Sequence, residues 1–254
     1  MSPAGKKEKP KYRCWAESSF SFFDAEEPGY GTVDLVRSFN VGKGLATFRG
    51  LCKFAIVVVS IIALAIDLYE DPFNYFYMAY LTRWTLCNCL AYLFASLILT
   101  AIPSAGFLLK FVWTWASLAT VHGIMISLLY WFLDWVPEYG VQFHNVMTHG
   151  GVAFLCYVNA FVLDRTPIRL KHIAVNWFWA VCYLIWSIIH NTVIMHNPHF
   201  DDDDDAIYDV LKWRTDTGSA VILACVVVFV AVPLFQTMVW AISLPGRVYL
   251  EILP

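Results

Sequence analysis

The residues best suited to chemistry lie inside apolar parts of the chain. The stretch "QFHNVMTHGG" at 142–151 places Asn145 and His149 in a region that is otherwise suited to hydrocarbon. Thr82, His122 and His190 occur in other apolar runs. Polar and ionisable groups within a membrane span are costly, so each of them calls for a functional or structural reason.

Six apolar stretches, each long enough to cross a bilayer as a helix, must position these residues. They lie at about 50–69, 75–101, 105–132, 141–163, 173–195 and 218–243. They lack the alternating pattern of a barrel, and open sheets cannot satisfy their backbone groups in lipid. The sequence therefore predicts an all-α, polytopic membrane protein with a six-helix bundle.

The composition agrees with a membrane protein and argues against a nucleic-acid-binding protein. The chain is 59% hydrophobic and only 15% charged, with 11 tryptophans, which is typical of a membrane protein with aromatic belts. The basic residues form no long cluster with interleaved aromatic residues, so we expect no nucleic-acid partner.

The charge of the loops predicts an orientation. The side that holds the N-terminal arm carries 14 Lys and Arg, and the opposite side carries three, while 12 of the 20 acids lie on that opposite side. The positive-inside rule therefore predicts that both termini are cytoplasmic. We expect an arm at 1–49, a transmembrane domain at 50–245 and a short tail at 246–254, with the "DDDDD" run at 201–205 as a solvated loop.

Four polar side chains from four different helices fall in one layer of the predicted bundle. At about 1.5 Å of rise per residue, Thr82, His122, His149 and His190 lie roughly 7–15 Å inside the acidic-side end of their helices. A shared cavity is therefore possible. Asn145 lies four residues before His149, so the two share a helix face, where Asn145 could orient the imidazole.

Each of these residues also has a structural interpretation. A threonine within a span usually bonds the carbonyl one turn earlier, and a lone histidine more often bonds a neighbouring helix than catalyses. Arg83 is expected to snorkel to the acidic surface, or to pair with Asp134, Glu138 or an anionic lipid-like ligand.

Several short motifs, in order, resemble two related membrane families: the androgen-induced-gene and androgen-dependent-TFPI-regulating proteins, and the Rolling stone proteins. "AYLTRWT" and "HNVMTHGG" are similar to segments in helices two and four of these families. "TPIRLKH" is similar to a Rolling stone loop, and "WSIIHNTV" followed by "IYDVLKW" is similar to the fifth-helix histidine and the element after it. The resemblance covers about residues 50–245.

In the androgen-induced branch, the resemblance implies a six-helix hydrolase of fatty acid esters of hydroxy fatty acids. Its intramembrane threonine nucleophile and histidine partner correspond by motif to Thr82 and His149. A threonine hydroxyl is a weak nucleophile that needs an adjacent base, usually histidine, so the chemistry is coherent. Asn145 or His190 could then stabilise the oxyanion, with His122 and Arg83 as supporting or substrate-binding residues.

Two other functions stay open at this point. The protein could be a non-catalytic membrane protein, such as an accessory subunit or a Rolling stone-like fusion or scaffold factor with membrane-protein partners. A haem or metal protein that uses His122, His149 and His190 is the least favoured alternative. We expect no cofactor and no metal, and membrane lipids and a lipid-like ester as partners. The predicted location is multi-pass, in an endomembrane, the plasma membrane or an organellar inner membrane.

Overall fold

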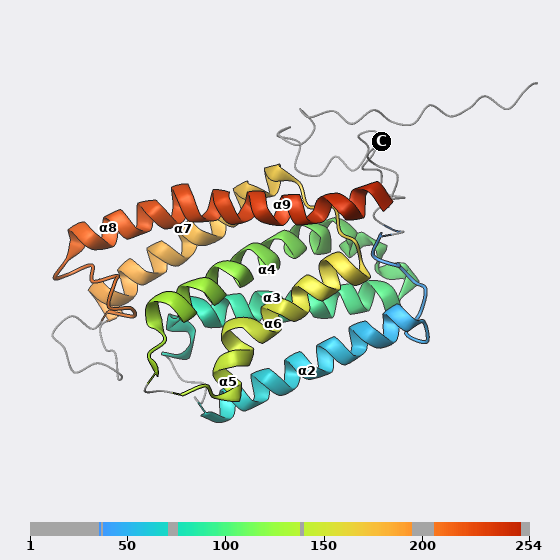
Figure 1. The fold of residues 1–254 in the computed structure, drawn as a ribbon, viewed down its shortest axis with the longest axis horizontal. Helices are drawn as coiled ribbons and strands as arrows, with labels where there is room; N and C mark the ends of the chain where they lie inside the picture. The colour runs from blue at the N-terminus through green and yellow to red at the C-terminus, as the bar shows by residue number, and fades with distance from the viewer. Residues whose placement is uncertain (1–35, 37, 71–75, 138–139, 195–205, 250–254) are drawn as a thin grey trace, which may run out of the picture.

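The computed structural model describes residues 36, 38–70, 76–137, 140–194 and 206–249, and its regular elements are all helical. Figure 1 shows an elongated bundle whose helices run back and forth along its long axis. The acidic run at 201–205 and most of the predicted N-terminal arm lie outside the described residues. The predicted all-helical class is confirmed.

Six helical units of the described chain are long and apolar enough to cross a membrane, as the hydropathy predicts. Their bounds are Phe48–Glu70, Leu81–Ala101, Pro103–Leu133, Phe143–Leu163, Leu170–Val193 and Thr217–Pro245. The α-helices within them are α2 (Phe48–Glu70), α3 (Leu81–Ala101), α4 (Leu109–Leu129), α5 (Phe143–Val146), α6 (Val152–Tyr157), α7 (Ile173–Ile189), α8 (Thr217–Val226) and α9 (Val232–Tyr249).

Short segments of other helix types complete these units. Turns of 3-10 helix occupy Tyr77–Ala79, Pro103–Leu108 and Leu170–His172. Wider π turns occupy Tyr130–Asp134, Met147–Gly151, Val158–Leu163, His190–Ile194 and Val227–Ala231. Turns of π helix are rare and are often found at functional sites. Here two of them, Tyr130–Asp134 and Met147–Gly151, contain side chains of the candidate site.

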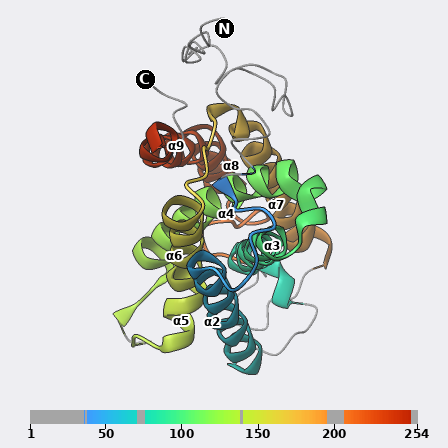
Figure 2. The ribbon, with the colours of Figure 1, turned by 90° about the vertical axis from the view of Figure 1, so that its right-hand side faces the viewer.

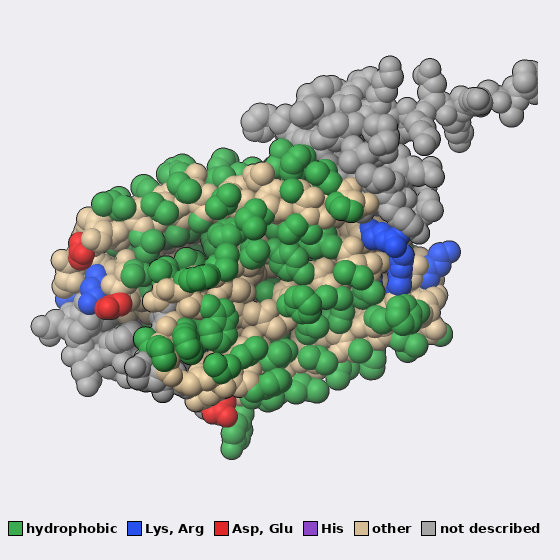
Figure 3. Space-filling view, in the orientation of Figure 1, with side chains coloured by type: hydrophobic (Ala, Val, Ile, Leu, Met, Phe, Trp, Pro, Cys, Tyr) green, Lys and Arg blue, Asp and Glu red, His purple; other side chains and the backbone are tan. Residues whose placement is uncertain are grey.

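The outer surface suits a hydrocarbon environment. Large apolar side chains such as Phe54, Phe178 and Phe229 are more than half exposed. Figure 3 shows that hydrophobic side chains cover the flank of the bundle, whereas Lys and Arg gather mainly at its right-hand end and Asp and Glu at its left-hand end and lower edge. Lipid tails are as apolar as these side chains, so a bilayer can cover such a flank as well as protein packing would.

The interior is built around α3 and α4, which lie in the middle of the bundle in Figure 2. Leu93 and Leu99 of α3 and Val112 and Trp113 of α4 are almost fully buried in one core cluster. Helix α4 also approaches α6 closely at Gly123, where an added Cβ would lie 2.8 Å from the Cβ of Ala153. A small residue there lets two helix backbones approach within the bundle.

A buried polar network ties three spans together near the basic end. The Lys53 ammonium of α2 lies 2.5 Å from an Asp164 carboxylate oxygen, and both side chains are almost completely buried. Lys53 also donates to the hydroxyls of Ser96 and Thr100 on α3. Ser96 and the Asn159 amide donate to the second Asp164 oxygen. These bonds satisfy charges that would otherwise be costly to bury.

The start of α3 differs from the prediction. The sequence places the second span from about Tyr75, because the aromatic run before Thr82 is apolar. In the structure, residues 77–79 form a 3-10 turn, Tyr80 is extended, and α3 begins at Leu81. Thr82 is therefore the second residue of its helix. The prediction that it lies roughly 7–15 Å inside the end of its helix is wrong for this residue.

Candidate functional site

Two tyrosine hydroxyls hold the start of α3 and so position Thr82. The Tyr183 hydroxyl of α7 donates to the carbonyl of Ala79, at 3.0 Å. The Leu81 N–H donates to the Tyr208 hydroxyl, at 3.1 Å. The first N–H groups of a helix have no acceptor within it, so the Tyr208 oxygen supplies one. Thr82 follows directly and is buried.

His149 meets Thr82 across the bundle. The Oγ1 atom of Thr82 lies 3.5 Å from Nδ1 of His149, at the outer limit of a hydrogen bond. The imidazole stacks on the ring of Tyr130, with centroids 3.4 Å apart and planes 6° from parallel. This stacking fixes the ring plane of His149. The structure thus brings together the two residues that the sequence singled out from different helices.

Asn145 has a different environment from the one expected. The four-residue spacing predicts that Asn145 could orient the imidazole of His149, but no hydrogen bond joins the two side chains in the structure. Asn145 is half-buried, and within the described chain its side chain forms no hydrogen bond. Gly151 also serves a local purpose, because an added Cβ there would lie 2.5 Å from the sulfur of Met147.

Arg83, next to Thr82, forms an ion pair with Asp67 of α2. Asp67 also accepts a hydrogen bond of 2.6 Å from the Tyr77 hydroxyl, and the Arg83 guanidinium lies 4.6 Å from the centre of the Tyr77 ring. The expectation that Arg83 snorkels or pairs with Asp134 or Glu138 did not include Asp67. The available signal was an acid, Asp67, in the last turn of a predicted span.

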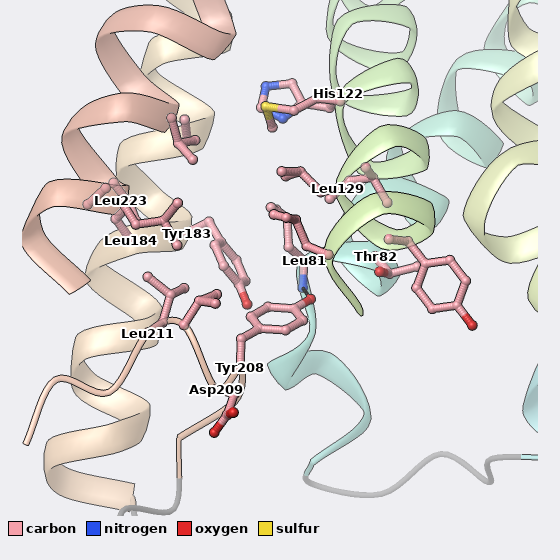
Figure 4. Close-up of a pocket in the computed structure, with 18 residues that line it drawn as sticks. Leu81, Thr82, His122, Leu129, Tyr183, Leu184, Tyr208, Asp209, Leu211 and Leu223 are labelled. Atoms are coloured by element: carbon pink, nitrogen blue, oxygen red, sulfur yellow. Dashed lines mark hydrogen bonds between the residues drawn. The ribbon is translucent and has the colours of Figure 1, made fainter. Parts of the chain in front are cut away.

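A cavity of about 140 Å³ adjoins Thr82. Its lining is mostly aliphatic and comes from α3, α4, α7, α8 and the segment before α8. The polar residues in that lining include Thr82, His122, Tyr183, Tyr208 and Asp209. Figure 4 shows His122 and Asp209 at opposite ends, with Tyr183 and Tyr208 between them and nearer Asp209.

The three histidines predicted to lie near Thr82 therefore have different surroundings in the structure. His149 contacts Thr82, and His122 lines the far end of the cavity. His190 is buried against Phe76 and Trp186, with ring centroids 5.1 and 6.0 Å away, and is not among the described residues that line the cavity. Within the described ranges, no three His, Cys, Asp or Glu side chains gather closely enough to hold a metal ion.

The fold and the apolar flank define the class of this protein: a helical bundle with six helices able to span a membrane, as in a multi-pass integral membrane protein. The chain matches no protein-family model, no curated protein and no solved structure. The resemblance to the androgen-induced-gene and Rolling stone families therefore stays a prediction from sequence motifs.

Proposed function

We propose that this protein is an intramembrane hydrolase of lipid esters in which Thr82 is the nucleophile and His149 is its general base. The observation that carries the proposal is the 3.5 Å approach of Thr82 Oγ1 to His149 Nδ1 beside an apolar cavity. Nucleophile and base are often this far apart before substrate binds, and the distance shortens in the reacting complex.

The proposed reaction has two steps. The Thr82 oxygen attacks the ester carbonyl carbon while His149 accepts the hydroxyl proton, and His149 then gives this proton to the departing alcohol oxygen. In the second step, His149 takes a proton from water, the resulting hydroxide attacks the acyl-threonine, and the carboxylic acid leaves as the Thr82 oxygen regains a proton. Tyr130 supports both steps by holding the imidazole plane.

The position of Thr82 in the first turn of α3 supplies a way to stabilise the oxyanion. The backbone N–H of Thr82 is one of the four donors that lack an acceptor within the helix, and the positive end of the helix dipole lies there. Such donors lower the energy of the tetrahedral intermediate. This role replaces the one expected of Asn145 or His190, whose contacts do not include Thr82.

The Arg83–Asp67 pair supports the same chemistry indirectly. An unpaired arginine beside the site would oppose the positive charge that His149 acquires when it accepts a proton. Asp67 offsets the charge of Arg83. We propose that the pair sets a nearly neutral field at the catalytic residues and does not bind an anionic head group.

The test is hydrolysis of a lipid ester by purified protein in lipid nanodiscs. Thr82→Ala and His149→Ala should each reduce kcat/KM by about 10²–10⁴-fold or more, the range for loss of a positioned acid–base group. Because the two residues act together, the double variant should be little worse than either one. Thr82→Ser keeps a hydroxyl and should retain part of the activity.

Matched controls come from the neighbouring turn. Thr148 is also buried, but its hydroxyl donates to the carbonyl of His144, at 2.8 Å, and forms no hydrogen bond with His149. Thr148→Ala and Thr148→Ser should keep wild-type kcat/KM. A folded Thr82→Ala protein with wild-type hydrolysis would refute the catalytic proposal and favour the non-catalytic accessory or scaffold function.

We also propose that the basic end of the bundle faces the cytoplasm, with both termini on that side. This is supported by the first residue of α2 and the last of α9, which lie at the same end in Figure 1, and by the lysines and arginines at that end in Figure 3. In sealed vesicles, an N-terminal epitope tag should be accessible from the cytoplasmic face and a tag at Asp203 should be hidden. The reverse pattern would contradict this orientation.

A further inference from the structure

One end of the cavity contains a buried polar side chain with an unused hydrogen-bonding capacity. His122 is fully buried, and the backbone of Asn176 in α7 is a polar neighbour of its ring, although neither ring nitrogen makes a hydrogen bond of ordinary geometry with it. A neutral imidazole carries one donor and one acceptor, and a single backbone neighbour can occupy only one of them, so at least one capacity is unused. Figure 4 shows the ring extending from α4 into the space between α4 and the helices across the cavity.

The side chains around His122 are mostly apolar. The neighbouring lining includes aliphatic or thioether side chains such as Met125, Ile126 and Leu223. A buried polar group costs free energy unless a hydrogen bond compensates it, and leaving it unpaired in an apolar cavity is especially costly. The arrangement suits a ligand that is apolar along its length and carries one hydrogen-bonding atom at its end.

The distance from Thr82 sets the length of such a ligand. Tyr130 lines the cavity and stacks on the histidine that contacts Thr82, and His122 lies eight residues earlier in the same helical unit. Eight residues span roughly 12 Å of helix. An extended chain covers roughly 3.3–3.6 Å for every three bonds. From the Thr82 oxygen to a hydroxyl on the eighth carbon there are nine bonds, roughly 10–11 Å, and the hydrogen bond to His122 adds about 3 Å, so an acyl chain of about eight carbons spans this distance.

The size of the cavity agrees with a hydrocarbon segment. Its volume of about 140 Å³ is close to that of an engineered apolar cavity, roughly 150 Å³, which binds benzene. We infer that the cavity is an acyl-chain pocket in which His122 recognises a neutral polar atom, such as a hydroxyl, at the far end of a medium-length chain. The substrate class would be medium-chain esters with an ω-hydroxyl group on the acyl chain, an assignment that rests on the proposed function.

Binding tests this inference apart from hydrolysis. Thr82→Ala protein in lipid nanodiscs is titrated calorimetrically with methyl octanoate and with methyl 8-hydroxyoctanoate. The ratio of the two Kd values is then compared with the ratio in the Thr82→Ala/His122→Leu protein, which cancels the different partitioning of the two esters into lipid. The hydroxyl preference should fall roughly tenfold without His122, the effect of one buried hydrogen bond.

Two further variants control for folding and for volume. Met125→Leu changes the same wall without removing a polar group, so it should alter the Kd of both esters alike and leave their ratio unchanged. His122→Gln keeps a donor and an acceptor and should retain part of it. In histidine-labelled Thr82→Ala protein, methyl 8-hydroxyoctanoate should also shift the ring nitrogen resonances of His122 more than methyl octanoate does, a measurement that needs no substitution at that residue.

The outcomes separate the two proposals. An unchanged Kd ratio in the folded His122→Leu variant, or equal resonance shifts with both esters, would overturn the role of His122 even if both esters are hydrolysed. A preference that His122→Leu abolishes, in a protein that hydrolyses neither ester, would support the pocket and reject the hydrolase. The expected result is a His122-dependent preference in binding, with the same preference in kcat/KM of the wild-type protein.

Discussion

Removal of the Lys53 charge is expected to destabilise the bundle strongly. Lys53 makes an ion pair with Asp164 and donates to Ser96 and Thr100, all within the protein interior. Lys53→Met keeps the length of the side chain but removes the charge and the donors. The Asp164 carboxylate then stays buried with hydrogen bonds from Ser96 and Asn159 but without a counter-charge.

The magnitude follows from the burial of this pair. Breaking a buried ion pair by removing one partner typically costs about 3–5 kcal/mol, because it leaves an uncompensated charge. The side chains of Lys53 and Asp164 are 1% and 0% exposed, so screening by solvent does not reduce this cost. In the double variant Lys53→Met/Asp164→Asn both charges are gone and the amide still accepts a hydrogen bond, so about 1–3 kcal/mol of the loss should be recovered.

The pH dependence gives a second signature. Burial raises the pKa of Asp164, and Lys53 opposes that rise. Without Lys53 the folded protein favours the protonated acid more than the unfolded chain does. Lys53→Met should therefore gain stability as the pH falls and lose it as the pH rises through the folded-state pKa of Asp164. The double variant should lack this dependence.

The assay is reversible unfolding in mixed micelles, followed by tryptophan fluorescence at several pH values. Lys110→Met serves as a control, because Lys110 is an exposed lysine of α4, and it should change the free energy of unfolding by less than about 0.5 kcal/mol. If Lys53→Met behaves like this control, or if the double variant is less stable than Lys53→Met, the ion pair does not stabilise the fold.

Two other predictions follow from local geometry. Gly123→Ala should cost about 1–3 kcal/mol of unfolding free energy by forcing α4 and α6 apart, whereas Gly106→Ala, whose added Cβ meets nothing within 4 Å, should be nearly neutral; equal losses in the same assay would show that no close approach exists at Gly123. Asp216 caps α8 by accepting the N–H of Ser219, and hydrogen bonds from Ser219 hold the pKa of Asp216 below its ordinary value. The stabilisation is therefore present above that ordinary value and lost as the pH falls through the folded-state pKa. Hydrogen exchange in the first turn of α8 should be faster in Asp216→Ala, and in the wild type it should approach that variant on acidification; an exchange ratio between the two that does not change with pH would contradict this.

The sequence alone determined the parts of this protein that depend on local composition. A span needs about 20 apolar residues because a bilayer has a fixed thickness, so the six helices could be recognised one by one. Thr82 and His149 could also be selected, since a polar group in an apolar run is visible without a fold. The start of α3 could not be recognised, because the aromatic run before Leu81 is as apolar as the membrane-spanning helix that follows it. The 3-10 turn in that run depends on the hydroxyls of Tyr183 and Tyr208, which come from distant segments.

The tertiary structure alone decided which polar groups meet. Lys53 pairs with Asp164, and Arg83 with Asp67, across different helices. Such contacts depend on the rotation of each helix about its axis, and π turns such as Met147–Gly151 change that rotation within a span. For this reason Thr82, His122, His149 and His190 share a predicted depth, yet only His149 contacts Thr82, while His122 faces the cavity and His190 packs against Phe76. Depth follows from the position along a span, whereas the direction of a side chain follows from how the spans pack.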